Sequence, residues 1–232
     1  MLPPAELLSV WEHGGGQDPV RRALSLVGAF HDSPAEVPPR LDIGTRDVLL
    51  ANLLRALVGD QVLACADCPA CGVLLDLSVD LRAVVELPMI ETGAWMNVEV
   101  GDQMVRFRLP TSEDLLSVAG LSPPRARAGV LRACLGIGPD DVLTPEVWRA
   151  VDAAMEEVAP AGAVDLLVQC PECGIESAVP LDVPALLWSE VDAEAVRLLR
   201  DVHDLALRYG WTESDVLALS PRRRASYLAM VG

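Results

Sequence analysis

Two copies of one five-residue pattern carry the clearest chemical signal in the sequence. They read Cys68-Pro69-Ala70-Cys71-Gly72 and Cys170-Pro171-Glu172-Cys173-Gly174. Each turn offers two thiolates, and a glycine after the second Cys readily takes the positive φ that directs backbone N–H groups toward a sulfur. Two such turns supply the four ligands of a tetrahedral site. We therefore predict that one structural Zn²⁺ is bound by Cys68, Cys71, Cys170 and Cys173.

A site closed by four thiolates keeps no coordination position open for water or substrate, so it is typical of a scaffold and not of an enzyme. The Cys-x-x-Cys spacing also occurs in dithiol redox motifs, and a thiol oxidoreductase remains an alternative. The presence of two matching turns favours metal binding. A disulfide framework is disfavoured, because a chain of 232 residues can bury a core without cross-links.

The remaining cysteines and histidines give weaker signals. Cys65 lies three residues before Cys68 and is interpreted as a spare thiol, with a ligand role as the alternative. Cys134 lies in an apolar run, which predicts a small buried core residue. His13, His31 and His203 are scattered without the spacing of a metal site or a catalytic triad. His203 flanks the apolar face of an expected helix, which indicates a structural role. No phosphate-binding loop is present.

Strand-like runs flank both cysteine turns. Residues 61–64 and 73–81 surround the first turn, and residues 164–168 and 175–181 surround the second. Each set predicts a β-hairpin with a metal-binding turn at its tip. One metal ion would join the hairpins into a zinc ribbon, split by the 98 residues 72–169. So long a segment inside a compact domain must be folded.

The segment between the turns has its own pattern of elements. Alternating residues predict a hairpin over 95–100 and 103–109, with a turn at Gly101-Asp102. Thr111 and Asp114 form a capping box that starts a helix. Cap residues followed by proline predict further helices over 125–135 and 146–158.

Both ends of the chain are expected to be helical. Helices are predicted over 4–12, from Pro19 onward, and over 46–58 with Thr45 as the cap. Residues 31–40 are proline-rich and predict a linker. After the second turn, helical sequence begins near residue 183, followed by a clear amphipathic helix over 193–209. Two short helices should follow, one capped by Thr212 and Asp215 and one beginning after Ser220-Pro221.

These expectations define an α+β fold: a split four-cysteine zinc ribbon, made of two β-hairpin knuckles, with an inserted small α+β subdomain, flanked by N-terminal and C-terminal helices. We predict N-terminal helices and linker over 1–40, a helix plus first hairpin over 41–82, the insertion over 83–163, the second hairpin over 164–182 and a C-terminal helical region over 183–232. The last three helices resemble a helix-turn-helix in outline, but a packing bundle is favoured.

Charge limits the classes of partner. The net charge is −16, from 18 basic and 34 acidic residues, and every basic residue is arginine. An acidic surface repels phosphate backbones, so protein partners are favoured over nucleic acid. The cluster Arg222-Arg223-Arg224 is interpreted as a solvated face or an acidic contact. The sequence shows no membrane-spanning stretch and no secretory signal, so we expect a cytoplasmic protein without membrane contact.

The order of motifs resembles a known family. Ile43-Gly44-Thr45-Arg46-Asp47 opens an apolar helix, a Cys-Pro-x-Cys-Gly turn and Val79-Asp80-Leu81 follow, and residues 107–115 precede the second turn. This arrangement, from about Leu41 to Val183, resembles the zinc-ribbon baseplate proteins of tailed phages and of phage-derived contractile injection systems, which include the baseplate hub assembly chaperones of T-even phages. Residues 202–215 and 221–224 resemble the injection-system members in particular. Residues 1–40 match no motif of the family.

The resemblance implies a non-enzymatic structural or assembly protein whose partners are baseplate or hub subunits of a contractile tail. A zinc-ribbon regulatory protein that binds nucleic acid through its helical C-terminus is the alternative. The two classes differ in a simple observable, because a regulator should give a salt-sensitive DNA shift, whereas an assembly protein should co-purify with tail proteins.

Overall fold

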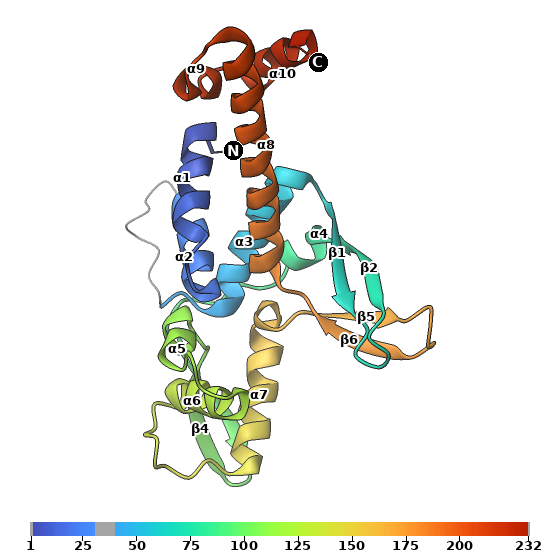
Figure 1. Cartoon of the computed structure of the whole chain (residues 1–232). Helices are drawn as coiled ribbons and strands as arrows, with labels where there is room; N and C mark the ends of the chain where they lie inside the picture. Colours follow the sequence, from blue (N-terminus) through green and yellow to red (C-terminus); the bar gives the residue numbers. More distant parts are fainter. Residues whose placement is uncertain (1, 31–39, 232) are drawn as a thin grey trace.

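The computed structural model describes residues 2–30 and 40–231. Of the expected linker over 31–40, only Arg40 is described, and His31 lies outside the described residues. The described part is α+β, with helices and three antiparallel hairpins that each form a separate two-stranded sheet. Figure 1 shows a helical body from which two hairpins project to the right, with the inserted segment below.

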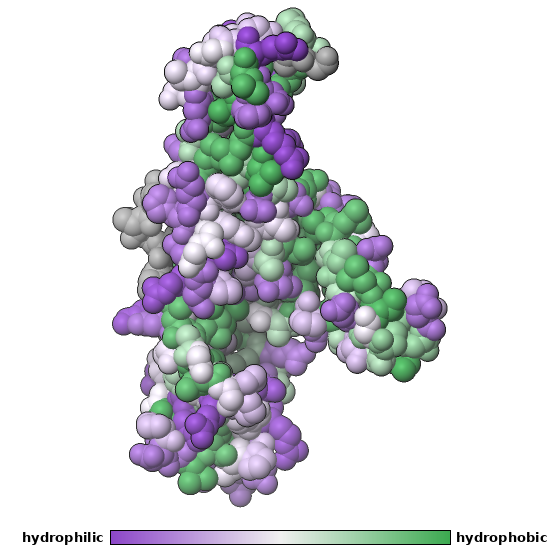
Figure 2. Space-filling model, in the orientation of Figure 1, coloured by the Kyte–Doolittle hydropathy of each residue, from purple (hydrophilic) through white to green (hydrophobic). Residues whose placement is uncertain are grey.

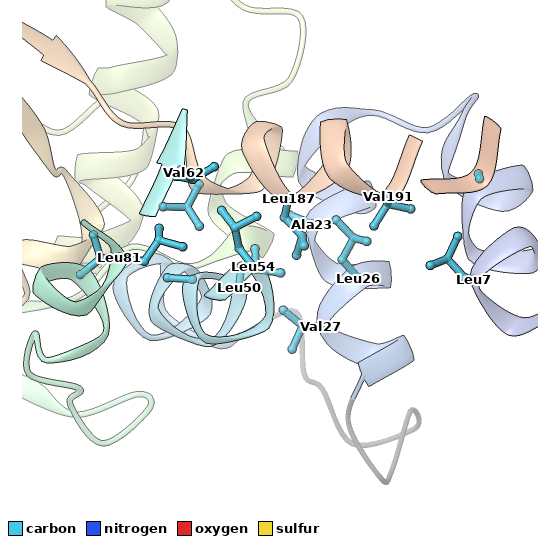
Figure 3. Close-up of a cluster of buried hydrophobic side chains, with 14 of the residues drawn as sticks. Leu7, Ala23, Leu26, Val27, Leu50, Leu54, Val62, Leu81, Leu187 and Val191 are labelled. Atoms are coloured by element: carbon cyan, nitrogen blue, oxygen red, sulfur yellow. The ribbon is translucent and has the colours of Figure 1, made fainter. Parts of the chain in front are cut away.

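The body is built from α1 (Pro4–Gly14), α2 (Pro19–Phe30), α3 (Ile43–Val58) and α8 (Val183–Tyr209). Their apolar faces share one core with the base of the first hairpin (Figure 3). Leucines and valines from all of these elements are almost fully buried there, and each buried side chain of this size is worth about 1.5–3 kcal/mol. The core includes Leu7, Leu26, Leu50, Leu54, Val62, Leu81, Leu187 and Val191.

The start of α3 differs from the prediction. Asp42, and not Thr45, is the N-cap, and its Oδ1 accepts a hydrogen bond from the backbone N–H of Thr45 at 2.9 Å. The prediction of Thr45 as the cap is therefore wrong, because an aspartate three residues earlier already satisfies one of the free N–H groups. The helix gains a turn and ends before Gly59, whose φ is 92°.

The two cysteine turns lie at the tips of hairpins, as predicted. The first hairpin pairs β1 (Gln61–Asp67) with β2 (Leu74–Asp80), and the second pairs β5 (Asp165–Gln169) with β6 (Glu176–Pro180). Asp80 then caps the short helix α4 (Leu81–Val85), which was not among the expected elements. In Figure 1 the second hairpin crosses the tip of the first.

The inserted segment has its own small core. It contains β3 (Trp95–Val100), β4 (Gln103–Arg108), α5 (Ser112–Ser117), α6 (Pro123–Leu135), α7 (Pro145–Val158) and the short 3₁₀ helix η2 (Pro160–Gly162). Phe107, Leu131 and Val151 form the centre of this core. The predicted capping box of Thr111 and Asp114 is present. The elements expected in the insertion are thus confirmed.

The C-terminal helix is longer than predicted. One continuous helix of 27 residues, α8, includes the expected helix over 193–209 and begins ten residues earlier. Pro184 does not interrupt this helix, because it lies in the first turn, where proline is tolerated. Gly210 ends α8 with φ 68°, and α9 (Glu213–Leu217) and α10 (Pro221–Val231) pack at its far end. No described helix, α8 included, carries an apolar stretch sufficient to cross a bilayer.

The arginine cluster on α10 divides into two parts. Arg222 and Arg223 are exposed, whereas Arg224 is buried and forms an ion pair with Asp201 of α8 at 2.9 Å. The interpretation as a solvated face therefore holds for Arg222 and Arg223, and the interpretation as an acidic contact holds for Arg224. The buried pair fixes α10 against α8.

Candidate metal centre

The two cysteine turns have nearly the same backbone geometry. In the first, the N–H of Gly72 donates to the carbonyl of Cys68 at 2.8 Å, and the N–H of Cys68 donates to Val73 at 2.8 Å. In the second, the Gly174 N–H donates to Cys170 at 2.9 Å, and the Cys170 N–H donates to Ile175 at 3.0 Å. Both glycines adopt the left-handed conformation, with φ of 75° and 71°, which other residues rarely take. Both turns thus project two sulfurs from a fixed loop.

The structure brings the four predicted ligands together. The Sγ atoms of Cys68, Cys71, Cys170 and Cys173 all lie within 4.8 Å of one another. The Sγ–Sγ distance is 3.9 Å between Cys68 and Cys173 and 3.7 Å between Cys71 and Cys170. A tetrahedral ion with metal–sulfur bonds near 2.3 Å separates its ligands by about 3.8 Å. The four cysteines therefore lie close enough to hold a metal ion, and the spacing is compatible with zinc.

Each turn contributes one buried and one exposed cysteine. Cys68 and Cys170 are 2% and 1% exposed, whereas Cys71 and Cys173 face solvent. The buried pair packs with Leu75 in a small apolar cluster, to which Val73 and Val168 also contribute. The cluster is separate from the core of the helical body. A metal bound here would therefore be covered on one side by apolar side chains from both hairpins.

The backbone prepares one sulfur for deprotonation. The N–H groups of Cys71 and Ala70 lower the pKa of the Cys68 thiol to about 7. The N–H of Val73 also lowers the pKa of the Cys71 thiol, but partial desolvation and the neighbouring thiols outweigh it and raise that pKa to about 12. Four thiolates this close repel one another when no cation lies between them. The cluster therefore favours a bound divalent ion over four free thiolates.

The other two cysteines lie outside the cluster. Cys65 is exposed on β1 and its thiol donates to Oδ1 of Asp76 across the hairpin at 3.4 Å. Cys134 is fully buried in the insertion, as predicted, and burial raises the pKa of its thiol to about 12. The alternative in which Cys65 replaces Cys68 has no geometric support. Neither thiol has the lowered pKa of a nucleophile.

The histidines do not form a site either. Nδ1 of His13 lies 2.6 Å from the carbonyl oxygen of Ser9 within α1. His203 lies on α8, as expected, and is exposed. Among the described residues, the four-cysteine cluster is the group of histidine, cysteine and acidic side chains whose ligand atoms converge.

Comparisons of the chain with protein-family models, with curated proteins and with solved structures found no match.

Proposed function

We propose that the four cysteines bind one Zn²⁺ and join the two hairpins into a split zinc ribbon. We further propose that the protein is a non-enzymatic structural or assembly protein, acting in the cytoplasm on the baseplate of a phage-tail-like contractile injection system. Its partners would be baseplate or hub subunits, and its role would be that of an assembly chaperone or of a baseplate component.

The observation that carries the metal proposal is the distance between sulfurs from opposite hairpins. Cys71 and Cys170 are 99 positions apart in the sequence and their Sγ atoms are 3.7 Å apart. A redox dithiol needs only the two cysteines of one turn, whereas the structure combines two turns in one cluster. A zinc ion with four protein thiolates has no free position for substrate, which supports a structural role.

Apolar side chains on the hairpins support a role in protein contacts. Leu63 and Leu167 are 80% and 76% exposed, and Leu74 and Ile175 are also exposed beside the cysteine turns. Figure 2 shows hydrophobic surface along the hairpin arm at the right. Exposed apolar groups gathered on one projection are typical of interaction surfaces. The net charge of −16 disfavours nucleic acid as the partner.

The baseplate assignment is supported by the motif order and by where those motifs lie. The N–H of Ile43 donates to the carbonyl of Pro110 at 2.9 Å, and Nη1 of Arg46 donates to Oγ of Ser112 at 3.1 Å. The segments that carry the resemblance, around residues 43–47 and 107–115, therefore meet at one junction between the helical body and the insertion. Because these two segments contact each other in the folded chain, there is a physical reason for both motifs to occur in the same sequence.

Affinity purification of the tagged full chain from its own cells, followed by mass spectrometry, tests the function. The proposal expects sheath, tube or baseplate proteins to co-purify with the native chain and to be reduced with the Cys170→Ser variant. Cys134→Ser is the matched control, because Cys134 lies outside the cluster. Recovery of no tail protein, together with a salt-sensitive gel shift of duplex DNA, would contradict the assignment.

A further inference from the structure

A groove runs along α6, in the inserted segment at the lower end of Figure 1. It measures about 510 Å³ and is lined by one face of α6 together with residues at the end of α5 and after α6. The α6 residues follow the helical spacing i, i+3, i+4, i+7 and i+8: Arg125, Ala128, Gly129, Arg132 and Ala133. The groove therefore follows about two turns of the helix.

The groove face of α6 is the one that the fold of the insertion leaves uncovered. On the other side of the helix, Leu131 and Cys134 are buried. Beside the groove, Leu121 is 49% exposed, and Val118 and Ile137 are half-buried. The groove thus offers apolar surface to a partner.

Small side chains in the middle of the groove leave room for close packing. Ala128 and Ala133 carry only methyl groups. A Cβ on Gly129 would lie 2.7 Å from Cγ1 of Val118, so the wall that contains Val118 packs directly against α6. The distance between packed helices depends on the side chains at the contact, and small ones allow a close approach. A second helix can therefore lie along this face.

The charged residues of the groove are both arginines without a carboxylate partner. Arg125 and Arg132 line the groove, and no aspartate or glutamate lines it with them. Within residues 2–30 and 40–231, neither arginine forms an ion pair. Arg125 is exposed, and Arg132 is half-buried, with Nε the nitrogen that is buried without a hydrogen-bond partner. In a chain of net charge −16, this groove is complementary to acidic groups.

The spacing of the two arginines indicates the shape of the acidic partner. They are seven residues apart in α6, which corresponds to about 10 Å along the helix axis. Carboxylates seven residues apart on a second helix have the same separation. Apolar side chains three and four residues after the first carboxylate would lie between the two ion pairs, over Ala128. An amphipathic helix in a groove is a common mode of peptide recognition.

We propose that the groove along α6 binds an acidic amphipathic helix of a partner protein, in which two carboxylates seven residues apart pair with Arg125 and Arg132. The carboxylates accept hydrogen bonds from the Nη atoms of the two arginines, and not from the covered Nε of Arg132. The inference goes beyond the baseplate proposal and needs no particular partner identity.

Titration of the full-length, metal-replete protein with the capped peptide AEQALLQAEQALLQA tests the groove, with amide chemical shifts as the readout. The glutamates of this peptide are seven residues apart, and two leucines lie between them on the same helix face. The matched peptide AQQALLQAQQALLQA replaces both glutamates with glutamine. We expect the acidic peptide to bind about tenfold more tightly, because each partly exposed ion pair contributes about threefold. The shifts should be largest around Ala128 and Ala133.

Four variants complete the experiment. Arg125→Gln and Arg132→Gln should each weaken binding of the acidic peptide about threefold and change binding of the glutamine peptide little. Ala128→Gln places a longer neutral side chain in the groove and should weaken binding of both peptides about tenfold. Arg21→Gln is the matched control, because it removes the same charge from an exposed residue outside the groove.

Equal binding of the two peptides, shifts away from α6, or unchanged affinity in both Arg125→Gln and Arg132→Gln would overturn the proposal. Shifts of the α6 amides that depend on protein concentration without peptide would instead show a second copy of the chain in the groove, and would also overturn it. Because the probes are synthetic peptides, failure here leaves the co-purification test of the baseplate proposal unaffected.

Discussion

The Sγ of Cys71 lies 3.7 Å from the Sγ of Cys170, although the two residues are 99 positions apart in the chain. The insertion leaves from the first hairpin and returns through the second, so this contact closes the segment that contains it. A metal ion between these sulfurs would act as a cross-link across a long loop. Cross-links of this length restrict the unfolded chain most.

Such a cross-link would make Cys170 far more important for stability than Cys134, although both are buried. Cys170→Ser removes a ligand, so we expect loss of the metal and a fall of about 3 kcal/mol or more in the free energy of unfolding. Cys134→Ser places a small hydroxyl in an apolar core, with an expected cost of about 1–2 kcal/mol. Denaturant unfolding and metal analysis of both variants measure the difference. Equal losses would count against the site.

The six thiols should react with a thiol reagent in three separate steps. Cys65 is exposed and outside the cluster, so one thiol should react at once. The four ligand thiols should react only after a chelator removes the metal. Cys134 is buried and should react only on unfolding. Rapid reaction of five thiols before chelation would instead indicate free dithiols.

The ion pair between Arg108 and Asp114 should make the insertion sensitive to acid. Burial acts to raise the pKa of Asp114, but hydrogen bonds from Arg108 and Thr111 outweigh it and hold the pKa below its ordinary value of 3.8. The stabilisation is therefore complete only well above the ordinary pKa, from about pH 5 upward, and is lost as pH falls through the folded pKa. Asp114→Asn should cost about 1–3 kcal/mol at pH 6.

The difference between Asp114→Asn and the native chain should shrink below pH 4, because protonated Asp114 resembles asparagine. Urea unfolding of both proteins at several pH values checks this, with a chelator present so that metal release does not contribute. A difference that stays constant between pH 6 and pH 3 would show that the charge of Asp114 contributes nothing.

The pair of Arg224 and Asp201 should control the attachment of α10. Asp201→Ala leaves a buried guanidinium without its partner, which costs about 3–5 kcal/mol. Adding Arg224→Met to Asp201→Ala should restore most of this loss, because a buried pair and an apolar replacement are often equivalent. Hydrogen exchange of the α10 amides reports the effect. Arg222→Ala, an exposed neighbour, should change protection little. Equal protection in all variants would exclude a role for the pair.

Local sequence signals predicted most of the elements that position the cysteine cluster. The two Cys-Pro-x-Cys-Gly turns fix their own backbone through glycines with positive φ, and alternation defines the strands around them. The capping boxes that begin at Thr111 and Thr212 were likewise predictable from the sequence, because each cap residue and its aspartate partner lie only three residues apart. Signals of this kind need no knowledge of tertiary structure.

Features that depend on distant contacts were not predictable. Asp42 and Thr45 are both good cap residues by type, and the residue after Asp42, Ile43, donates its N–H to the distant carbonyl of Pro110. The cavity between the helical body and the insertion is lined by Asp42 at the N-cap of α3, by carboxylates on α7 and by Asp165 on β5, which share no local pattern. The continuity of α8 was also missed, because its polar residues between 189 and 194 weaken the apolar periodicity.

The most direct test of the account is the metal content of the native protein after gentle purification without chelators. Elemental analysis should find about one zinc per chain, and Cys170→Ser should carry almost none while Cys134→Ser keeps it. Native protein without tightly bound metal, or zinc retained in full by Cys170→Ser, would contradict the central claim that sulfurs from both hairpins hold one ion.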